Sequence, residues 1–156
     1  MPHLFRVDKR DFNVGDVAKT AAEYFDKFPP ETKLLEERFE LFRPTIKPPR
    51  RECLFLFESL DAARNHWSIM TDGKLYKTDV PNDAILHRGD MRLLDVIADK
   101  TKAGESTKQT YVDYWNGVMT GEPIIEIMVA SAPIIDIVSK DQEERITLLK
   151  KRWKME

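Results

Sequence analysis

Two carboxylates lie in the least polar stretch of the chain, EPIIEIMVASAPIIDIV at 122–138. Glu126 belongs to the run IIEI and Asp136 to the similar run IIDI. A carboxylate held in an apolar wall can stabilise positive charge that develops on a substrate, or deprotonate an attacking nucleophile. Because burial disfavours the ionised form, such a carboxylate needs a cation close by. Arg6, Arg50 and Arg51 are available for this purpose.

The orientation of Glu126 separates two interpretations. If 122–130 forms a strand, Glu126 and Met128 share one face, and Ile125 and Ile127 share the other. The glutamate then either points into a cleft from a rigid strand, or lies on an edge strand and faces water, which discourages edge-to-edge association. For Asp136 we expect the solvent side of the next strand.

The first part of the chain predicts one strand and two helices. The run HLFRVD alternates apolar and polar residues and predicts a strand over His3–Asp8. Apolar residues recur at helical spacing over 15–28 and again over 31–42, and the proline pair at 29–30 separates the two helices. The segment 43–51, RPTIKPPRR, is rich in proline and basic residues, so we expect an irregular loop there.

The rest of the chain mixes strands and helices. Ser59 can cap a helix that follows it, and Gly89 is expected to form a turn. The expected elements are a buried strand over 53–57, a helix over 60–70, strands over 74–80 and 84–87, a brief helix from about Asp90, a helix over 107–116, the two apolar runs as strands and a helix over 141–153.

These elements predict the fold class. Strands and helices do not alternate regularly, which argues against a doubly wound sheet. We therefore expect an α+β fold with a split, mostly antiparallel sheet and flanking helices. A chain of 156 residues has the size of one domain, so 1–156 is expected to fold as a single domain with room for a ligand cleft.

Composition and hydropathy limit the compartment in which the protein is expected and the kinds of binding site it can contain. The net charge of -2 gives no global field that would favour a nucleic acid or a membrane. The single Cys53 excludes an internal disulfide and a multi-cysteine metal site. The N-terminus lacks the apolar core of a signal peptide, and no apolar run is long enough for a membrane span. We expect a cytoplasmic protein with no membrane partner.

Three segments carry a family resemblance. LFRV near the N-terminus, CLFLFESLDAARNHW in the middle and PIIEIMV late in the chain resemble, in this order, the signature of the diphtheria-toxin-like ADP-ribosyltransferase superfamily. With HRGDM and YWNG, the whole chain resembles small bacterial domains of uncharacterised function placed in that superfamily. Its members cleave NAD and transfer the ADP-ribose group to an acceptor.

The resemblance implies a set of site residues. Arg6 would anchor NAD, Phe55 would form the platform for the nicotinamide ring with Ser59 after it, and Glu126 would be the catalytic glutamate. His3 is an alternative to Arg6, because other members of the superfamily use a histidine on the first strand. The remaining residues that the resemblance adds along the cofactor site are His87, Tyr114 and Trp115.

Two functions follow as hypotheses. The first is an NAD-dependent mono-ADP-ribosyltransferase, a toxin or effector with a protein, nucleic acid or small molecule as acceptor and a neutralising protein as a further partner. The second is a non-catalytic binding module of the same fold that holds a protein or nucleic acid through the cleft, the basic loop 43–51 and the helix around 145–153.

Other site types are disfavoured by the sequence. A nuclease-type metal site built from Asp79, His87 and Glu126 would lack tight ligand spacing, so we expect no metal. The chain also lacks the motifs of P-loop proteins, dinucleotide-binding Rossmann folds, serine hydrolases and zinc proteases.

Overall fold

The computed structural model describes residues 3–21 and 26–153 of the chain. Within these residues the fold is α+β, with seven strands in one antiparallel sheet and five α-helices, which confirms the predicted class. The strands are β1 (His3–Asp8), β2 (Val17–Lys19), β3 (Leu54–Phe57), β4 (Lys74–Asp79), β5 (His87–Asp90), β6 (Ile125–Val129) and β7 (Ser131–Ser139). The helices are α1 (Pro30–Leu41), α2 (Leu60–Ile69), α3 (Arg92–Lys102), α4 (Lys108–Trp115) and α5 (Gln142–Trp153).

The sheet is almost interrupted near its centre. Its strand order is β2-β7-β4-β1-β3-β6-β5, and all neighbours are antiparallel. β1 pairs with β4 along its whole length but meets β3 only where Phe5 lies opposite Phe57. Beyond that pair, Arg6 bridges the two strands, because its Nη1 donates a hydrogen bond of 3.0 Å to the carbonyl oxygen of Phe55. The expected split is not present, because the strands on both sides of this narrow junction belong to one continuous sheet.

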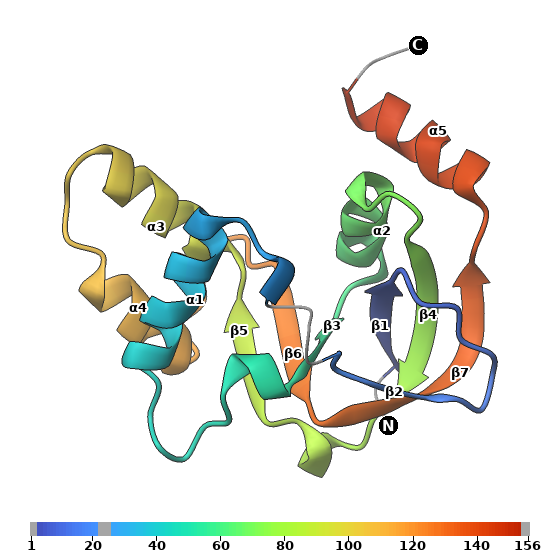
Figure 1. Cartoon of the computed structure of the whole chain (residues 1–156), viewed down its shortest axis with the longest axis horizontal. Coiled ribbons are helices and arrows are strands. Elements are labelled where there is room, and N and C mark those ends of the chain that lie inside the picture. Colours follow the sequence, from blue (N-terminus) through green and yellow to red (C-terminus); the bar gives the residue numbers. More distant parts are fainter. Residues whose placement is uncertain (1–2, 22–25, 154–156) are drawn as a thin grey trace.

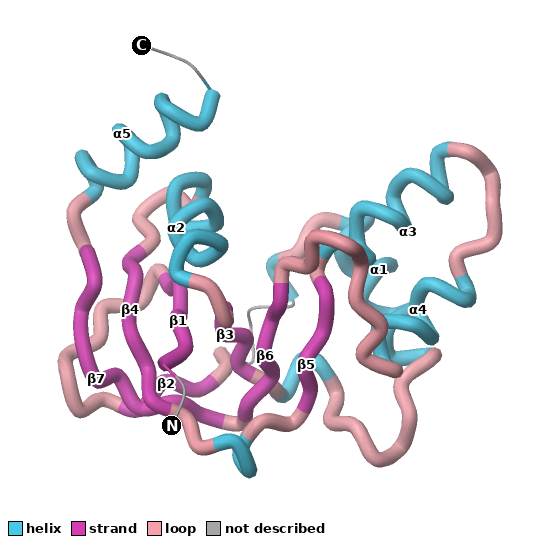
Figure 2. Tube along the Cα trace, turned by 180° about the vertical axis from the view of Figure 1, so that it is seen from behind, coloured by secondary structure: helices cyan, strands magenta, loops and turns pink. Residues whose placement is uncertain are grey.

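The helices form two groups at opposite ends of the molecule, as Figures 1 and 2 show from the two sides. α2 packs against α5 and against β1 at one end. α1, α3 and α4 gather beside β5 and β6 at the other end. β3 and β6 run between the two groups, and the candidate site lies on these strands. In the described parts of the chain, no helix has the length and the apolar character needed to cross a bilayer.

Side-chain alternation divides the core between the two faces of the sheet. On one face, Leu4, Leu56 and Ile127 belong to a single apolar cluster. On the opposite face there are two clusters, because the helices there form two groups. Phe57 belongs to the cluster under α2, and Phe55 borders the cluster under α1, α3 and α4. β3 therefore contributes a ring to each cluster, and the border between them lies along this strand.

The predicted helix over 15–28 is wrong in its first part. Val17–Lys19 forms the strand β2, which pairs with the beginning of β7, and residues 22–25 lie outside the described residues. Ala18, in the middle of β2, is fully buried by this pairing. The contact with a strand more than a hundred residues away in the sequence thus overrides the local helical spacing.

The predicted turn at Gly89 is also wrong. Gly89 lies inside β5, opposite Glu126 of β6, and the strand predicted over 84–87 begins only at His87. A Cβ atom at position 89 would lie 2.4 Å from a ring carbon of Tyr114. The glycine is therefore needed for the close approach of a side chain and not for a turn.

Most other predicted elements are confirmed to within a few residues. α1 begins at Pro30, where the missing N–H is not needed by the helix. Ser59 caps α2, because its hydroxyl accepts a hydrogen bond of 3.3 Å from the backbone N–H of Ala62. Gly117 follows α4 with a positive φ of 74°, the conformation that commonly ends a helix.

Candidate functional site

Glu126 lies on an interior strand and is buried. β6 is flanked by β3 and β5, where Phe57 and Gly89 are the register partners of Glu126. Only 5% of Glu126 is exposed, so the alternative of an edge-strand glutamate that faces water is wrong. Asp136, in the similar run of β7, is exposed as predicted. The two apolar runs therefore place their carboxylates in opposite environments.

Arg50 is the cation that neutralises Glu126. Arg50 Nη1 donates a hydrogen bond of 2.6 Å to Glu126 Oε1, and Arg50 Nε donates one of 2.8 Å to Glu36 Oε2. The hydroxyl of Tyr114 donates to the same Oε1 and lies 2.5 Å from Arg50 Nη1. We call these four residues, Glu36, Arg50, Tyr114 and Glu126, the Glu126 centre.

The chain delivers Arg50 to this place through a short 3-10 helix, Arg50–Glu52, directly before β3. Its guanidinium carbon lies 4.7 Å from the ring centre of Phe39 and 4.6 Å from that of Phe55. Such cation–π contacts are strongest where water is excluded, and only 8% of Arg50 is exposed. The basic segment 43–51 therefore contains one buried arginine, Arg50, and is not a purely solvated loop.

Two pKa shifts fix the protonation of the Glu126 centre. Burial alone would lower the pKa of Arg50, but the charges of Glu126 and Glu36 raise it well above its usual value, so the guanidinium stays charged. Burial and the charge of Glu126 raise the pKa of Tyr114 well above its usual value. The Tyr114 hydroxyl is therefore protonated and remains a donor to Glu126.

The second oxygen of Glu126 faces a cavity. No residue in the described ranges donates a hydrogen bond to Oε2, and Oε2 is not among the buried polar atoms that lack a partner, so it is not sealed off. Glu126 lines a cavity of about 130 Å³ together with Arg6, Phe55 and His66, which we call the small cavity. Arg6, Phe55 and Glu126, which the family resemblance placed in the main roles, thus converge on one space.

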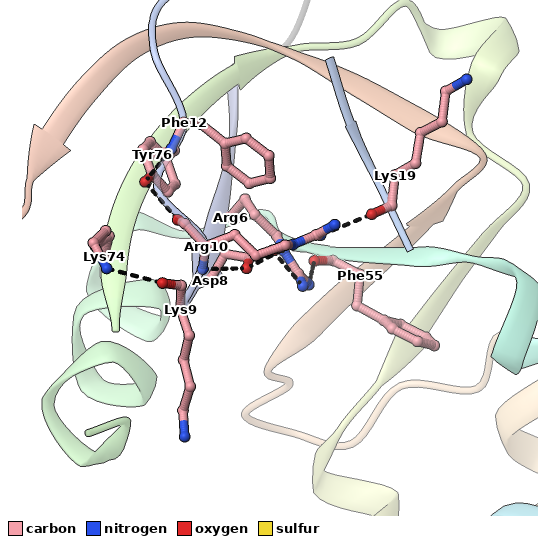
Figure 3. A network of polar contacts seen from close by, with 9 residues as sticks. All are labelled: Arg6, Asp8, Lys9, Arg10, Phe12, Lys19, Phe55, Lys74 and Tyr76. Atoms are coloured by element: carbon pink, nitrogen blue, oxygen red, sulfur yellow. Dashed lines mark hydrogen bonds and ion pairs between the residues drawn. The ribbon is translucent and has the colours of Figure 1, made fainter. Parts of the chain in front are cut away.

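A second cluster of charges, the Asp8 centre (Arg6, Asp8 and Arg10; Figure 3), shares Arg6 with the small cavity. Arg6 Nε donates a hydrogen bond of 2.9 Å to Asp8 Oδ2, and Arg10 Nε donates one of 3.0 Å to Asp8 Oδ1. Burial alone would raise the pKa of Asp8, but hydrogen bonds from Arg10 and the charge of Arg6 lower it below its usual value. The centre therefore carries two positive charges and one negative charge.

The Asp8 centre borders a groove of about 660 Å³ that continues the small cavity, since Arg6, Phe55 and His66 line both. Lys9 and Lys27 add two more cations to this basic groove, and Asp8 is the one carboxylate among the described residues that line it. Cys53 also lines the groove, but the thiol is a poor nucleophile because burial raises its pKa to about 11. The prediction that this thiol is buried is confirmed.

Two of the remaining predicted cofactor residues lie behind the site. His87 is buried, its pKa is lowered to about 4 by burial and by the charge of Lys47, and its Nε2 donates a hydrogen bond of 3.0 Å to the carbonyl oxygen of Tyr114. Trp115 is buried and donates from Nε1 to the carbonyl oxygen of Phe39. Neither residue is part of the small cavity wall, and both support the helix that carries Tyr114.

The other predicted residues have separate positions. Tyr114 belongs to the Glu126 centre through its hydroxyl and through the contact of its ring with Arg50, but it is not part of the small cavity wall. Ser59, besides capping α2, lines a further cavity next to the small one. His3 is exposed at the start of β1, so it does not replace Arg6 as a residue of the small cavity.

Sequence reasoning did not single out four residues of the site, namely Asp8, Arg10, Glu36 and His66. Asp8 and Arg6 lie two residues apart on β1, so their common face was a signal for a pair. Glu36 and His66 lie on helices, and no local pattern distinguished them from other polar helix residues. His66 is half-buried and lines the small cavity. Its ring forms no hydrogen bond with any other described residue.

We compared the chain with protein-family models, curated proteins and solved structures, and none of the three comparisons found a match. In the described ranges, no group of three or more histidine, cysteine, aspartate or glutamate side chains is placed to hold a metal ion. The function must therefore be argued from the geometry of the two charged centres and the cavities between them.

Proposed function

We propose that the protein is an NAD-dependent mono-ADP-ribosyltransferase. One observation carries the proposal, namely that the two charged centres that border the continuous space have opposite charge ratios. The Glu126 centre holds two carboxylates for one arginine, and the Asp8 centre holds two arginines for one carboxylate. NAD has a matching distribution, because a cationic nicotinamide ring is joined through a ribose to an anionic diphosphate.

The size of the small cavity supports the nicotinamide position. A cavity of about 150 Å³ is known to hold one benzene ring, and the small cavity measures about 130 Å³. Phe55 lines it and offers an aromatic ring next to which a pyridinium ring would be stabilised. The net negative charge of the Glu126 centre would favour a cationic ring over a neutral ring in this position.

The basic groove supports the diphosphate position. It is large enough for the remainder of the dinucleotide, and its cations Lys9, Arg10 and Lys27 are more exposed than Arg6. Arg6 lies where the groove meets the small cavity, and Asp8 and the Phe55 carbonyl oxygen fix its guanidinium in one orientation. A fixed guanidinium fork binds phosphate or ribose oxygens with defined geometry.

The free oxygen of Glu126 then has a chemical role. When the bond between the nicotinamide nitrogen and the ribose C1′ breaks, its electron pair leaves with the nicotinamide and positive charge develops on the ribose. Glu126 Oε2 would face this charge and stabilise it. Arg50 and Tyr114 hold Oε1, so the carboxylate needs no reorganisation during the reaction.

The test compares two carboxylates of similar sequence context. Purified wild type, Glu126→Gln and Asp136→Asn are incubated with labelled NAD, with and without cell lysate, and both nicotinamide release and label transfer are measured. We expect Glu126→Gln to lose about 100-fold or more of both rates, and Asp136→Asn, which changes an exposed carboxylate, to keep them. Urea unfolding shows whether each variant is folded. Equal rates for Glu126→Gln and wild type would refute the role of Glu126.

A second candidate, the non-catalytic binding module, is favoured by one observation. Glu126 Oε1 is already occupied by two strong donors, so the carboxylate also has a structural role. A module of this kind, which holds a protein or a nucleic acid, would show no NAD binding by calorimetry and would release no nicotinamide. Release of nicotinamide by the wild type that depends on Glu126 would exclude it.

A further inference from the structure

A third space lies beside the small cavity, on the side of α2 and α5. It measures about 620 Å³, and its apolar wall comes mainly from Met91, Pro123, Ile124 and Ile125 together with Phe57. Its polar groups include two arginines from distant parts of the chain, Arg92 at the start of α3 and Arg152 near the end of α5. We call it the arginine cavity.

The two arginines of this cavity are not neutralised. Arg92 Nε and Arg152 Nη1 each donate a hydrogen bond of 3.1 Å to a backbone carbonyl oxygen, and neither forms an ion pair within the described residues. Glu58, the one carboxylate among the described lining residues, is held by two hydrogen bonds of 2.6 and 2.7 Å from Arg88. The arginine cavity therefore has an excess of positive charge and suits an anion.

His66 lies between the arginine cavity and the small cavity and lines both. Its ring lies 5.2 Å from that of Phe57, centre to centre, and no described residue forms a hydrogen bond with it. Burial lowers the pKa of His66, the charges of Arg6 and Arg152 lower it further, and the charge of Glu126 opposes them. The imidazole is therefore neutral at neutral pH and can accept a proton.

Building on the proposed function, we propose that the arginine cavity is the acceptor site, that it takes a nucleotide, and that His66 accepts the proton of the attacking hydroxyl group. Two guanidinium groups suit a phosphate, and the apolar wall suits a flat base. A nucleotide offers both groups, whereas inorganic phosphate offers only the first. His66 is then placed between the acceptor on one side and the ribose C1′ of NAD on the other.

The proposed step balances. The acceptor hydroxyl oxygen forms a bond to C1′ of the ribose while the bond from C1′ to the nicotinamide nitrogen breaks. The electron pair of the broken bond leaves with nicotinamide, which becomes neutral. The proton of the hydroxyl passes to a ring nitrogen of His66, and solvent removes it later. No oxidant, reductant or further reactant is required.

Binding can be tested without any turnover. The chain has three histidines, so the imidazole NMR signal of His66 can be assigned with His66→Gln and followed while uridine monophosphate, inorganic phosphate or a 5′-phosphorylated oligonucleotide is added. We expect the nucleotide to shift this signal, with at least tenfold higher affinity than inorganic phosphate. The two nucleotide probes distinguish a free nucleotide from a strand end.

Variants locate the binding. Arg92→Ala with Arg152→Ala should weaken binding of uridine monophosphate at least tenfold, whereas Arg64→Ala, on the exposed side of α2, should leave it unchanged. Displacement of uridine monophosphate by ADP-ribose would overturn the acceptor assignment, because the cavity would then belong to the NAD site. Equal affinity for inorganic phosphate and the nucleotide, or no shift at all, would overturn the nucleotide assignment.

Turnover separates this inference from the proposed function. With labelled NAD and the better nucleotide probe, wild type should form an ADP-ribosylated nucleotide, and His66→Gln should form it about 100-fold more slowly. Nicotinamide release that yields only free ADP-ribose would contradict the acceptor assignment and leave the proposed function in place. No nicotinamide release by wild type would contradict the proposed function itself, while the NMR result would still report on the cavity.

Discussion

The Glu126 centre and the Asp8 centre both neutralise a buried carboxylate, but they differ in the ratio of arginines to carboxylates and in exposure to solvent. In each, a buried carboxylate on a sheet strand is neutralised by arginine. At Glu126 one buried arginine serves two carboxylates and is enclosed by aromatic rings. At Asp8 two arginines, 17% and 39% exposed, serve one carboxylate and border a wide groove.

This difference indicates which centre is rigid and which remains available to a ligand. Ionic groups out of water are costly unless all their partners are in place, so any loss of a partner from the Glu126 centre should strongly destabilise the fold. The Asp8 centre has spare donors on Arg6 and Arg10 and contacts water, so it can exchange solvent for an anion. The site thus combines a preorganised negative centre with an accessible positive centre.

The strongest test of this comparison removes the shared arginine of the Glu126 centre. Arg50→Ala leaves the buried Glu126 and the half-buried Glu36 without their cation, and we expect a loss of about 3–5 kcal/mol in the free energy of unfolding. The measurement is equilibrium unfolding in urea monitored by circular dichroism.

The neighbouring arginine provides the control for that variant. Arg51 is 61% exposed and forms only a 3.4 Å ion pair with Asp26, so Arg51→Ala should cost about 0–1 kcal/mol. Similar losses for Arg50→Ala and Arg51→Ala would show that the Glu126 centre does not contribute to stability as a buried ion pair.

Removing the negative charge of Asp8 should reduce the free energy of unfolding by less than Arg50→Ala does. Asp8→Asn keeps the shape but weakens the hydrogen bonds from Arg6 and Arg10, and we expect a loss of about 1.5–3 kcal/mol at neutral pH. Because both arginines reach water, part of the loss is recovered by solvation. A loss as large as that of Arg50→Ala would contradict the distinction between the two centres.

The same variant carries a pH dependence. The pKa of Asp8 in the folded protein lies below the ordinary value of 3.8, so the folded state binds this proton more weakly than the unfolded state. The stability that Asp8 contributes is therefore complete above about pH 3.8 and is lost as the pH falls through the lower folded pKa. Urea midpoints of wild type and Asp8→Asn should converge in that range, and a constant difference would contradict the shift.

The smallest change tests how tightly the Glu126 centre is packed. Gly89→Ala would place a methyl group 2.4 Å from the Tyr114 ring and displace the hydroxyl that holds Glu126, so we expect a loss of about 1–3 kcal/mol. Gly121→Ala is the matched control, because a Cβ atom there has no neighbour within 4 Å. An unchanged urea midpoint for Gly89→Ala would mean that the centre tolerates repacking.

Much of the fold could be predicted because the signals are local. The alternation in β1, the buried run of β3 and the cap formed by Ser59 each depend on residues that are close in the sequence. β2 could not be predicted, since three residues form a strand only by pairing with β7. Gly89 was misassigned for a related reason, because its role depends on Tyr114, which approaches from another part of the chain.

For the site, the sequence alone determined that the Glu126 carboxylate, if buried among isoleucines, needs a cation close by. It predicted the solvent side for Asp136 but left open whether Glu126, in a nearly identical run, points into a cleft or faces water. The tertiary structure decided which arginine neutralises Glu126, which of its oxygens stays free, and that His66 separates two cavities. These choices depend on side chains brought together from different strands and helices, and the free energy of burying a charge is set by that full surrounding.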